Sequence, residues 1–160
     1  ELQENIGNHK VLIFSQFLGM LALIREKMNE NNIAYQYFDG SYTAIQREKA
    51  IQEFQNNEEC SVFLISLKAG GMGLNLTAAD YVYIVDPWWN PAVEQQAIDR
   101  THRIGQTKNI FAYRYICKDT VEEKIMLLKD KKNLLVKDII SDDSNMVKQL
   151  TKDDVAYLFS

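Results

Sequence analysis

Short apolar runs alternate along the chain with longer segments in which apolar residues recur at the spacing of a helix. Runs rich in β-branched and aromatic residues predict five strands, at residues 10–14, 35–38, 61–66, 81–85 and 109–117. The segments between them predict amphipathic helices, and a further helix is expected over residues 120–136. This regular alternation predicts an α/β domain with a mostly parallel sheet and right-handed crossovers.

Polar residues that suit helix N-termini stand before several of these segments. The expected caps and first positions are Ser15, the capping-box pair Thr43 and Gln46, Asn90 with Pro91, and Thr151 with Asp154. Thr151 and Asp154 predict a short terminal helix, in a segment that we expect to be an extension of the core. We therefore expect a core domain over residues 1–136 and a C-terminal extension over residues 137–160.

The composition is that of a globular domain, with 46% hydrophobic and 25% charged residues in a chain of 160. No apolar run is long enough to cross a bilayer, so no membrane partner is expected. Cys60 and Cys117 lack a CxxC spacing, which predicts a reducing compartment and no structural zinc. The first residue is Glu1, so we expect a piece of a longer protein.

The net charge of −4 conceals a basic stretch at residues 96–118, where five cations accompany the single acid Asp99. These cations are Arg100, Arg103, Lys108, Arg114 and Lys118. A local positive field can bind a polyanion even in an acidic protein. On charge alone, an ordinary solvated face is the more common explanation.

Open parallel sheets bind ligands at the carboxyl ends of their strands, and three strands here are followed by loops of unusual composition. The loops are Ser15-Gln16, residues 66–73 and residues 86–91. The glycine-rich second loop matches neither GxxxxGK[ST] nor GxGxxG, so the chain lacks a phosphate cradle of its own. Lys68 beside the glycines suits a phosphodiester, although composition alone fits a tight turn equally well.

Two more features of the basic stretch and the third loop point to a polyanion. Gln96, Arg100 and Arg103 are four and three residues apart, which places them on one helix face. Two arginine forks suit a phosphate, and ion pairs on a surface helix with Asp99 and Glu94 are the alternative. Of the adjacent Trp88 and Trp89, one is expected to pack and the other to meet a partner or a nucleic acid. His102 is expected to be structural, and His9 is too remote to complete a metal site.

Four tracts occur in an order and spacing that resemble a known family. They are VLIFSQF (11–17), DGSYTAIQRE (39–48), LISLKAGGMGLNLTAAD (64–80) and VDPWWNPAVEQQAIDRTHRIGQ (85–106). From about residue 10 to residue 124 the chain resembles the second RecA-like lobe of Swi/Snf-type ATPases, the double-stranded-DNA translocases of helicase superfamily 2. The tract QAIDRTHRIGQ is highly specific for that family. The resemblance implies a three-layer RecA-like domain with helices on both faces of the sheet.

The resemblance also implies roles for individual residues. Arg100 and Arg103 match catalytic arginines that reach ATP phosphates held on the first lobe, and Gly73 and Gln96 join them in the implied ATP-binding set. Implied contacts with the DNA backbone come from Ser15, Gln16, Gly40, Ser41, Arg47, Ser66, Lys68, Ala69, Gly70, Gly71 and Trp89. Leu67 and Lys68 stand where many relatives have Thr and Arg, which preserves the cation.

The family's phosphate loop and Mg²⁺-binding Asp-Glu motif belong to the first lobe and do not occur in this chain. The resemblance thus implies the second motor lobe of a chromatin-remodelling-type DNA translocase, inactive alone. ATP and Mg²⁺ would be bound mainly by the N-terminal RecA-like lobe of the same polypeptide. Double-stranded DNA and DNA-bound protein complexes are the implied partners, in the nucleoid of a prokaryote or the nucleus of a eukaryote. A superfamily 2 lobe acting on RNA and a non-catalytic nucleic-acid-binding module remain alternatives.

Overall fold

The structure is a computed structural model that describes residues 9–70, 74–86, 91–99, 101, 108–135, 151, 153, 154 and 156, except the side chains of residues 91, 92 and 129–135. It divides the chain into two compact units, residues 1–115 and residues 116–160. The domain boundary expected after residue 136 borders a stretch outside the described residues, and it stays a prediction.

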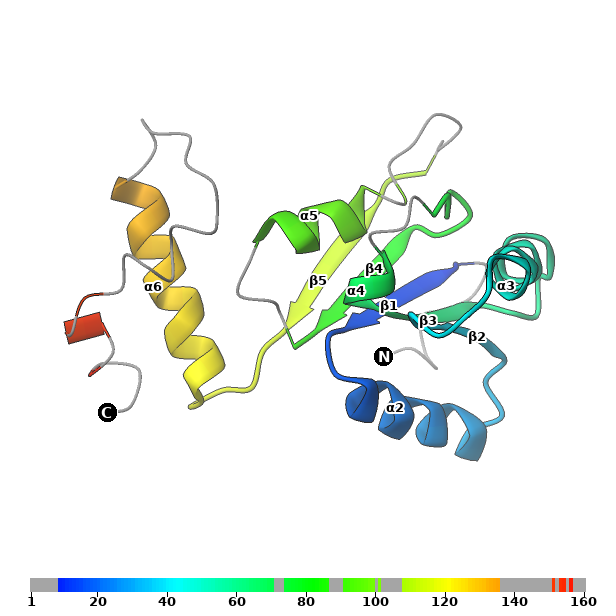
Figure 1. The fold of residues 1–160 in the computed structure, drawn as a ribbon, viewed down its shortest axis with the longest axis horizontal. Helices are drawn as coiled ribbons and strands as arrows, with labels where there is room; N and C mark the ends of the chain where they lie inside the picture. The colour runs from blue at the N-terminus through cyan, green and yellow to red at the C-terminus, as the bar shows by residue number, and fades with distance from the viewer. Residues whose placement is uncertain are drawn as a thin grey trace. The chain divides into compact units, whose positions relative to one another are not determined.

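The first unit is built on a five-stranded sheet (Figure 1). Its strands are β1 (Val11–Ser15), β2 (Tyr35–Phe38), β3 (Val62–Ser66), β4 (Tyr81–Val85) and β5 (Phe111–Tyr115). The order across the sheet is β2-β3-β1-β4-β5, and every neighbouring pair is parallel. β1 and β3 are buried along their whole length, as their continuous apolar sequences require in the middle of a parallel sheet. The predicted parallel α/β fold is confirmed.

Helices cover both faces of this sheet (Figure 1). They are α2 (Leu18–Glu30), α3 (Ala44–Asn56), α4 (Leu67–Gly70) and α5 (Pro91–Ile98). Because successive strand residues point to opposite faces, Val11 and Ile13 pack with Leu21 of α2, whereas Leu12 and Phe14 pack with α3, α4 and α5. The expected three-layer arrangement, with helices on both faces of the sheet, is therefore confirmed.

Of the helix N-termini predicted in this unit, one is confirmed and one is wrong. Thr43 and Gln46 form the expected capping box: Thr43 Oγ1 accepts the Gln46 N–H at 3.3 Å, and Gln46 Oε1 accepts the Thr43 N–H at 2.9 Å. The expected cap at Ser15 is wrong, since Ser15 ends β1 and α2 follows the N-cap Phe17, which makes no side-chain cap. α4 was also unexpected, because the glycines after Ser66 suggested a turn.

The second unit contains α6 (Val121–Leu135), close to the predicted 120–136. The acids of its first turn accept hydrogen bonds from the preceding backbone, with the Asp119 N–H donating to Glu123 Oε2 at 2.9 Å. The predicted terminal capping box is present, because the Asp154 N–H donates to Thr151 Oγ1 and the Thr151 N–H to Asp154 Oδ2. Among the described residues, no helix combines the length and the apolar character needed to cross a bilayer.

Candidate functional site

The carboxyl ends of β1, β3 and β4 meet at one edge of the sheet. The strand register pairs Ser15 with Ser66 on one side and with Val85 on the other. The loops that follow these strands therefore start next to one another, at the edge where open parallel sheets bind ligands. This edge brings together the Ser15-Gln16 loop, the start of the glycine-rich segment and the entry to α5.

A buried hydrogen bond joins two of these loops. The side chain of Ser15 is fully buried, and its Oγ donates to Asp86 Oδ2 at 2.7 Å and accepts the Phe17 N–H at 3.1 Å. Asp86 is also buried, and its backbone has the left-handed φ of 61°. No local sequence pattern connects Asp86 with Ser15, because the two residues are 71 positions apart in the chain.

The Gly40-Ser41 turn after β2 is held by Asp39. Its Oδ1 accepts the Ser41 N–H at 2.8 Å and the Ser41 hydroxyl at 2.6 Å, and its Oδ2 accepts the Tyr37 hydroxyl at 2.7 Å. The Ser41 hydroxyl, with a further contribution from Tyr37, holds the pKa of Asp39 below its ordinary value. Burial first, and then the hydrogen bond to Asp39, raise the pKa of Tyr37 to about 12. Both donors of Ser41 are thus used inside the turn.

The segment after β3 contains one exposed cation, Lys68, between buried neighbours. Ser66 Oγ accepts the Ala69 N–H at 3.3 Å, which closes the first turn of α4, and both Ser66 and Ala69 are buried. The expected DNA-contacting residues whose exposure the structure describes therefore fall into an exposed group and a buried group. Gln16, Gly40, Ser41, Arg47 and Lys68 are at least partly exposed. The side chains of Ser15, Ser66 and Ala69 are buried, so in this structure they can shape a contact only through the backbone around them.

α5 is attached to the sheet by an ion pair. Arg114 of β5 donates from Nε to Glu94 Oε2 at 2.6 Å, and the Glu94 side chain is only 3% exposed. From the sequence, Glu94 is expected to be a surface acid near the arginines, whereas in the structure it lies on the buried side of α5 with Arg114 as a partner. Whether Arg100 or Arg103 also pairs with Glu94 or Asp99 lies outside the described residues, and that alternative stays open. Its second oxygen, Oε1, has no hydrogen-bond partner in the part of the chain described. Gln96 lies on the same helix with its side chain exposed.

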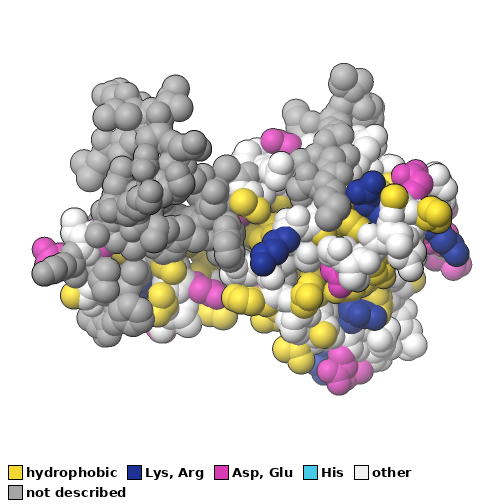
Figure 2. All heavy atoms as spheres, in the orientation of Figure 1, with side chains coloured by type: hydrophobic (Ala, Val, Ile, Leu, Met, Phe, Trp, Pro, Cys, Tyr) yellow, Lys and Arg dark blue, Asp and Glu magenta, His cyan; other side chains and the backbone are white. Residues whose placement is uncertain are grey.

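Several residues that the sequence singled out lie outside the described residues. They are Gly71, Gly73, Trp88, Trp89, Arg100, His102 and Arg103. Their expected roles stay predictions. On the face shown in Figure 2, the described Lys and Arg side chains of the first unit lie apart from one another, with acidic side chains among them. Over residues 9–70, 74–86 and the other described stretches, no group of three or more metal-binding side chains occurs.

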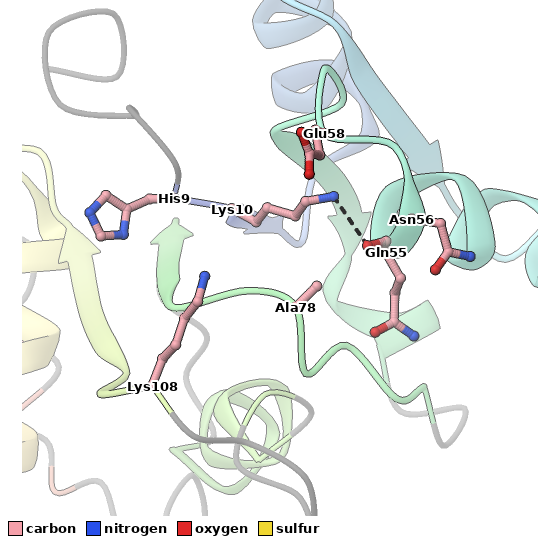
Figure 3. Close-up of a pocket in the computed structure, with 7 residues that line it drawn as sticks. All are labelled: His9, Lys10, Gln55, Asn56, Glu58, Ala78 and Lys108. Atoms are coloured by element: carbon pink, nitrogen blue, oxygen red, sulfur yellow. Dashed lines mark hydrogen bonds between the residues drawn. The ribbon is translucent and has the colours of Figure 1, made fainter.

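A cavity of about 540 Å³ lies at the opposite end of the sheet, where β1 and β4 begin (Figure 3). Lys10 reaches across it to the C-terminus of α3, where its Nζ donates to the carbonyl groups of Phe54, Gln55 and Asn57. Asp80 accepts the Lys10 N–H at 3.1 Å and lies 3.8 Å from Lys108 Nζ. Burial lowers the pKa of Lys10. Lys10, Asp80 and Lys108 each interact with other groups of the chain at this cavity.

Comparison with known proteins agrees with this fold. Residues 1–105 match the helicase conserved C-terminal domain. "Helicase-like transcription factor CHR28" of Arabidopsis thaliana is 43% identical over 157 residues, which is 97% of this chain and 16% of that protein. "DNA repair protein rad8" of Schizosaccharomyces pombe is 43% identical over 160 residues, 99% of this chain and 14% of that protein. The chain thus spans only a small part of these relatives.

Two solved structures are similar throughout. The C-terminal part of the Fun30 ATPase domain has a TM-score of 0.75 at 34% identity, over 95% of this chain and 46% of that chain. The Sulfolobus solfataricus SWI2/SNF2 ATPase core domain has a TM-score of 0.72 at 37% identity, over 94% of this chain and 31% of that one. The chain belongs to the helicase conserved C-terminal domain family and, within it, to the C-terminal RecA-like lobes of Swi2/Snf2-type ATPases.

Proposed function

We propose that this chain is the second motor lobe of an ATP-dependent translocase that moves along double-stranded DNA. The observation that carries the proposal is the tract QAIDRTHRIGQ at residues 96–106, which begins in α5 and continues from it. α5 is tied to β5 through Glu94 and Arg114, so the tract starts from a fixed support at the carboxyl edge of the sheet. In the complete protein, ATP would close two lobes and hydrolysis would reopen them.

In this proposal, Arg100 and Arg103 act on a nucleotide that the N-terminal lobe holds. Guanidinium groups supplied in this way neutralise charge that develops during phosphoryl transfer and are worth about 10³–10⁵ in rate. That rate factor corresponds to about 4–7 kcal/mol of barrier. Among the described residues no group of three or more metal-binding side chains could hold Mg²⁺, and the proposal assigns the ligands of Mg²⁺ to the other lobe.

The same proposal makes the loops after β1, β2 and β3 a grip on the DNA backbone. Lys68 supplies an exposed cation, and Gln16 and Arg47 supply further polar groups that are partly exposed. Contacts with phosphates carry little sequence information. They weaken as the salt concentration rises, because the release of counterions from DNA then becomes less favourable. The isolated chain offers half of a two-lobed groove, so we expect weak binding to duplex DNA that declines steeply with salt. Tight binding in high salt would contradict a backbone grip.

The deciding experiment measures ATP hydrolysis by the complete protein with and without duplex DNA. Arg103→Ala should lower the DNA-stimulated rate by about 10³-fold or more while DNA affinity is kept. Lys49→Ala, which removes an exposed cation of α3, is the matched control and should behave as the parent. An unchanged rate of ATP hydrolysis in Arg103→Ala would refute a role of Arg103 in phosphoryl transfer.

The same assay separates the two alternatives. Stronger stimulation by RNA than by duplex DNA would favour an RNA-directed lobe of superfamily 2. Nucleic-acid binding without any ATP turnover in the complete protein would favour a non-catalytic module. As a DNA motor, the protein would act on DNA-bound protein complexes, in the nucleoid or in the nucleus according to the organism.

A further inference from the structure

We propose that Asp86 is a positioning residue that makes the Ser15-Gln16 loop and the entry to α5 move together, and so couples DNA contact to ATP turnover. The inference rests on the proposed function, in which the first of these segments meets DNA and the second leads to the arginines. Asp86 itself touches neither ligand. It acts through Ser15.

The geometry of Ser15 assigns it a structural use within the loop. Its side chain is 0% exposed, so the hydroxyl is not available at the surface. The hydroxyl donates to Asp86 Oδ2 at 2.7 Å, the shorter of its two contacts with acceptors, the other being the Phe17 carbonyl at 3.3 Å. The hydroxyl oxygen accepts the Phe17 N–H, which closes a turn around Gln16. The turn that carries Gln16 is therefore stabilised by the side chain of Asp86, which directly follows β4.

The backbone of Asp86 ties the same residue to the other segment. A φ of 61° is uncommon for a residue other than glycine, and Asp86 adopts it directly after β4, on the side of that strand from which the sequence runs to α5. A buried hydrogen bond to a carboxylate is costly to break. The bond therefore holds the end of β4, from which the chain continues to α5, to the loop that follows β1.

Three substitutions separate the side chain of Asp86 from its backbone. Asp86→Asn keeps an oxygen acceptor, and asparagine tolerates the left-handed region. Asp86→Gly keeps the backbone freedom and removes the acceptor. Ser15→Ala removes the donor at nearly the same volume, and the double variant Ser15→Ala/Asp86→Gly closes a double-mutant cycle.

The experiment uses the complete protein and a duplex DNA titration of its ATPase rate, well below the thermal midpoint of each variant. Asp86→Gly and Ser15→Ala should each raise the DNA concentration that gives half-maximal stimulation by about tenfold, as expected for loss of a hydrogen bond to a charged group. The double variant should be no worse than either single one, and Asp86→Asn should stay within about twofold of the parent. A purely structural role would lower the thermal midpoint and leave stimulation of the folded protein unchanged.

Several results would overturn the inference. They are additive losses in the double variant, unchanged stimulation in both single variants, or an Asp86→Asn protein as impaired as Asp86→Gly. Direct contact of Ser15 with DNA predicts a loss in Ser15→Ala alone. If Asp86→Gly does not fold, Ser15→Ala together with Asp86→Asn decides. A parent protein that does not respond to duplex DNA refutes the proposed function, whereas a responsive parent with unaffected variants refutes only the role of Asp86.

Discussion

Replacing Arg114 by methionine would leave Glu94 as a buried carboxylate without its partner. The two side chains are 2.6 Å apart, and they differ greatly in burial, at 43% exposed for Arg114 and 3% for Glu94. Methionine retains much of the apolar length of arginine, so the main change is the loss of the guanidinium. The substitution therefore isolates the free energy of leaving one charge uncompensated.

The expected cost follows from this asymmetry. Removing one partner of a fully buried ion pair destabilises a protein by about 3–5 kcal/mol. Arg114 is partly solvated, and water that screens the pair in the parent also reaches the vacated site, so we expect about 1–3 kcal/mol. Glu94 Oε1 has no partner among the described residues, so none of them replaces the lost donor without a rearrangement. In a domain of this size, each kcal/mol lowers the thermal midpoint by about 2–4 °C.

Thermal and urea denaturation of the purified chain measure this cost. Arg114→Met/Glu94→Gln should recover part of the loss, since a neutral amide is cheaper to bury than an unpaired carboxylate. Lys27→Met is the matched control, because its 2.6 Å pair with Glu30 is exposed on both sides. We expect no measurable change in its midpoint.

Three results would refute this reasoning. The first is an Arg114→Met midpoint equal to that of Lys27→Met. The second is a double variant that is less stable than Arg114→Met, which would show that the carboxylate is tolerated without its partner. The third is a change in the slope of the free energy of unfolding against urea concentration. Such a change would mean that the substitution alters the compactness of the native or the denatured state, and not only the ion pair.

Other consequences of the structure can be measured in the same way. Lys10→Met removes the ammonium that caps α3 and should cost about 1 kcal/mol at neutral pH, and an unchanged urea midpoint would contradict that role. The pKa of Asp39 is lowered in the folded state, so its stabilisation is present above about pH 4 and is lost as the pH falls through the folded-state pKa. Asp39→Asn should therefore flatten the acid limb of a stability-against-pH curve, and an equally steep limb would contradict this. The pKa of Tyr37 is raised to about 12, so its contribution is complete below about pH 10 and is lost as the pH rises toward 12. Tyr37→Phe should remove that alkaline loss, and a curve that still falls there would assign it to another group.

The strands were predictable because each is a short apolar run, and β2 and β4 begin and end where the sequence indicates. β5 was predicted too long, at 109–117 instead of Phe111–Tyr115. Its length is set by its neighbour, since β4 offers only the five residues that pair with it. Sequence pattern reports the propensity of one segment, whereas pairing depends on the segment beside it.

The candidate site was less predictable for the same reason. Ser15 suits a helix cap when only its neighbours are considered, yet its hydroxyl is taken by Asp86, which lies 71 residues further along. Glu94 suits a surface helix, yet the order of the sheet places Arg114 beneath it. The capping box of Thr43 and Gln46 was predictable, because both partners lie within one turn. Sequence patterns thus predicted contacts within one turn of chain. They could not predict hydrogen bonds and ion pairs between residues that only the order of the strands brings together.

These two long-range contacts act on one segment of chain. Asp86 fixes its start to β1, and Glu94 fixes its helix to β5, so the residues from 86 to 98 are attached to the sheet at two points. The ion pair of Glu94 holds α5 to β5, and the exposed Gln96 lies on that helix. If the arginines that follow must meet a phosphate across a cleft, the precision of that meeting is set by these attachments, since a misplacement of about 1 Å can cost about 10²-fold in rate. Under the proposed function, the buried carboxylates of Asp86 and Glu94 support the arginine-bearing tract, and their removal should lower the DNA-stimulated ATPase rate of the complete protein even where the fold survives.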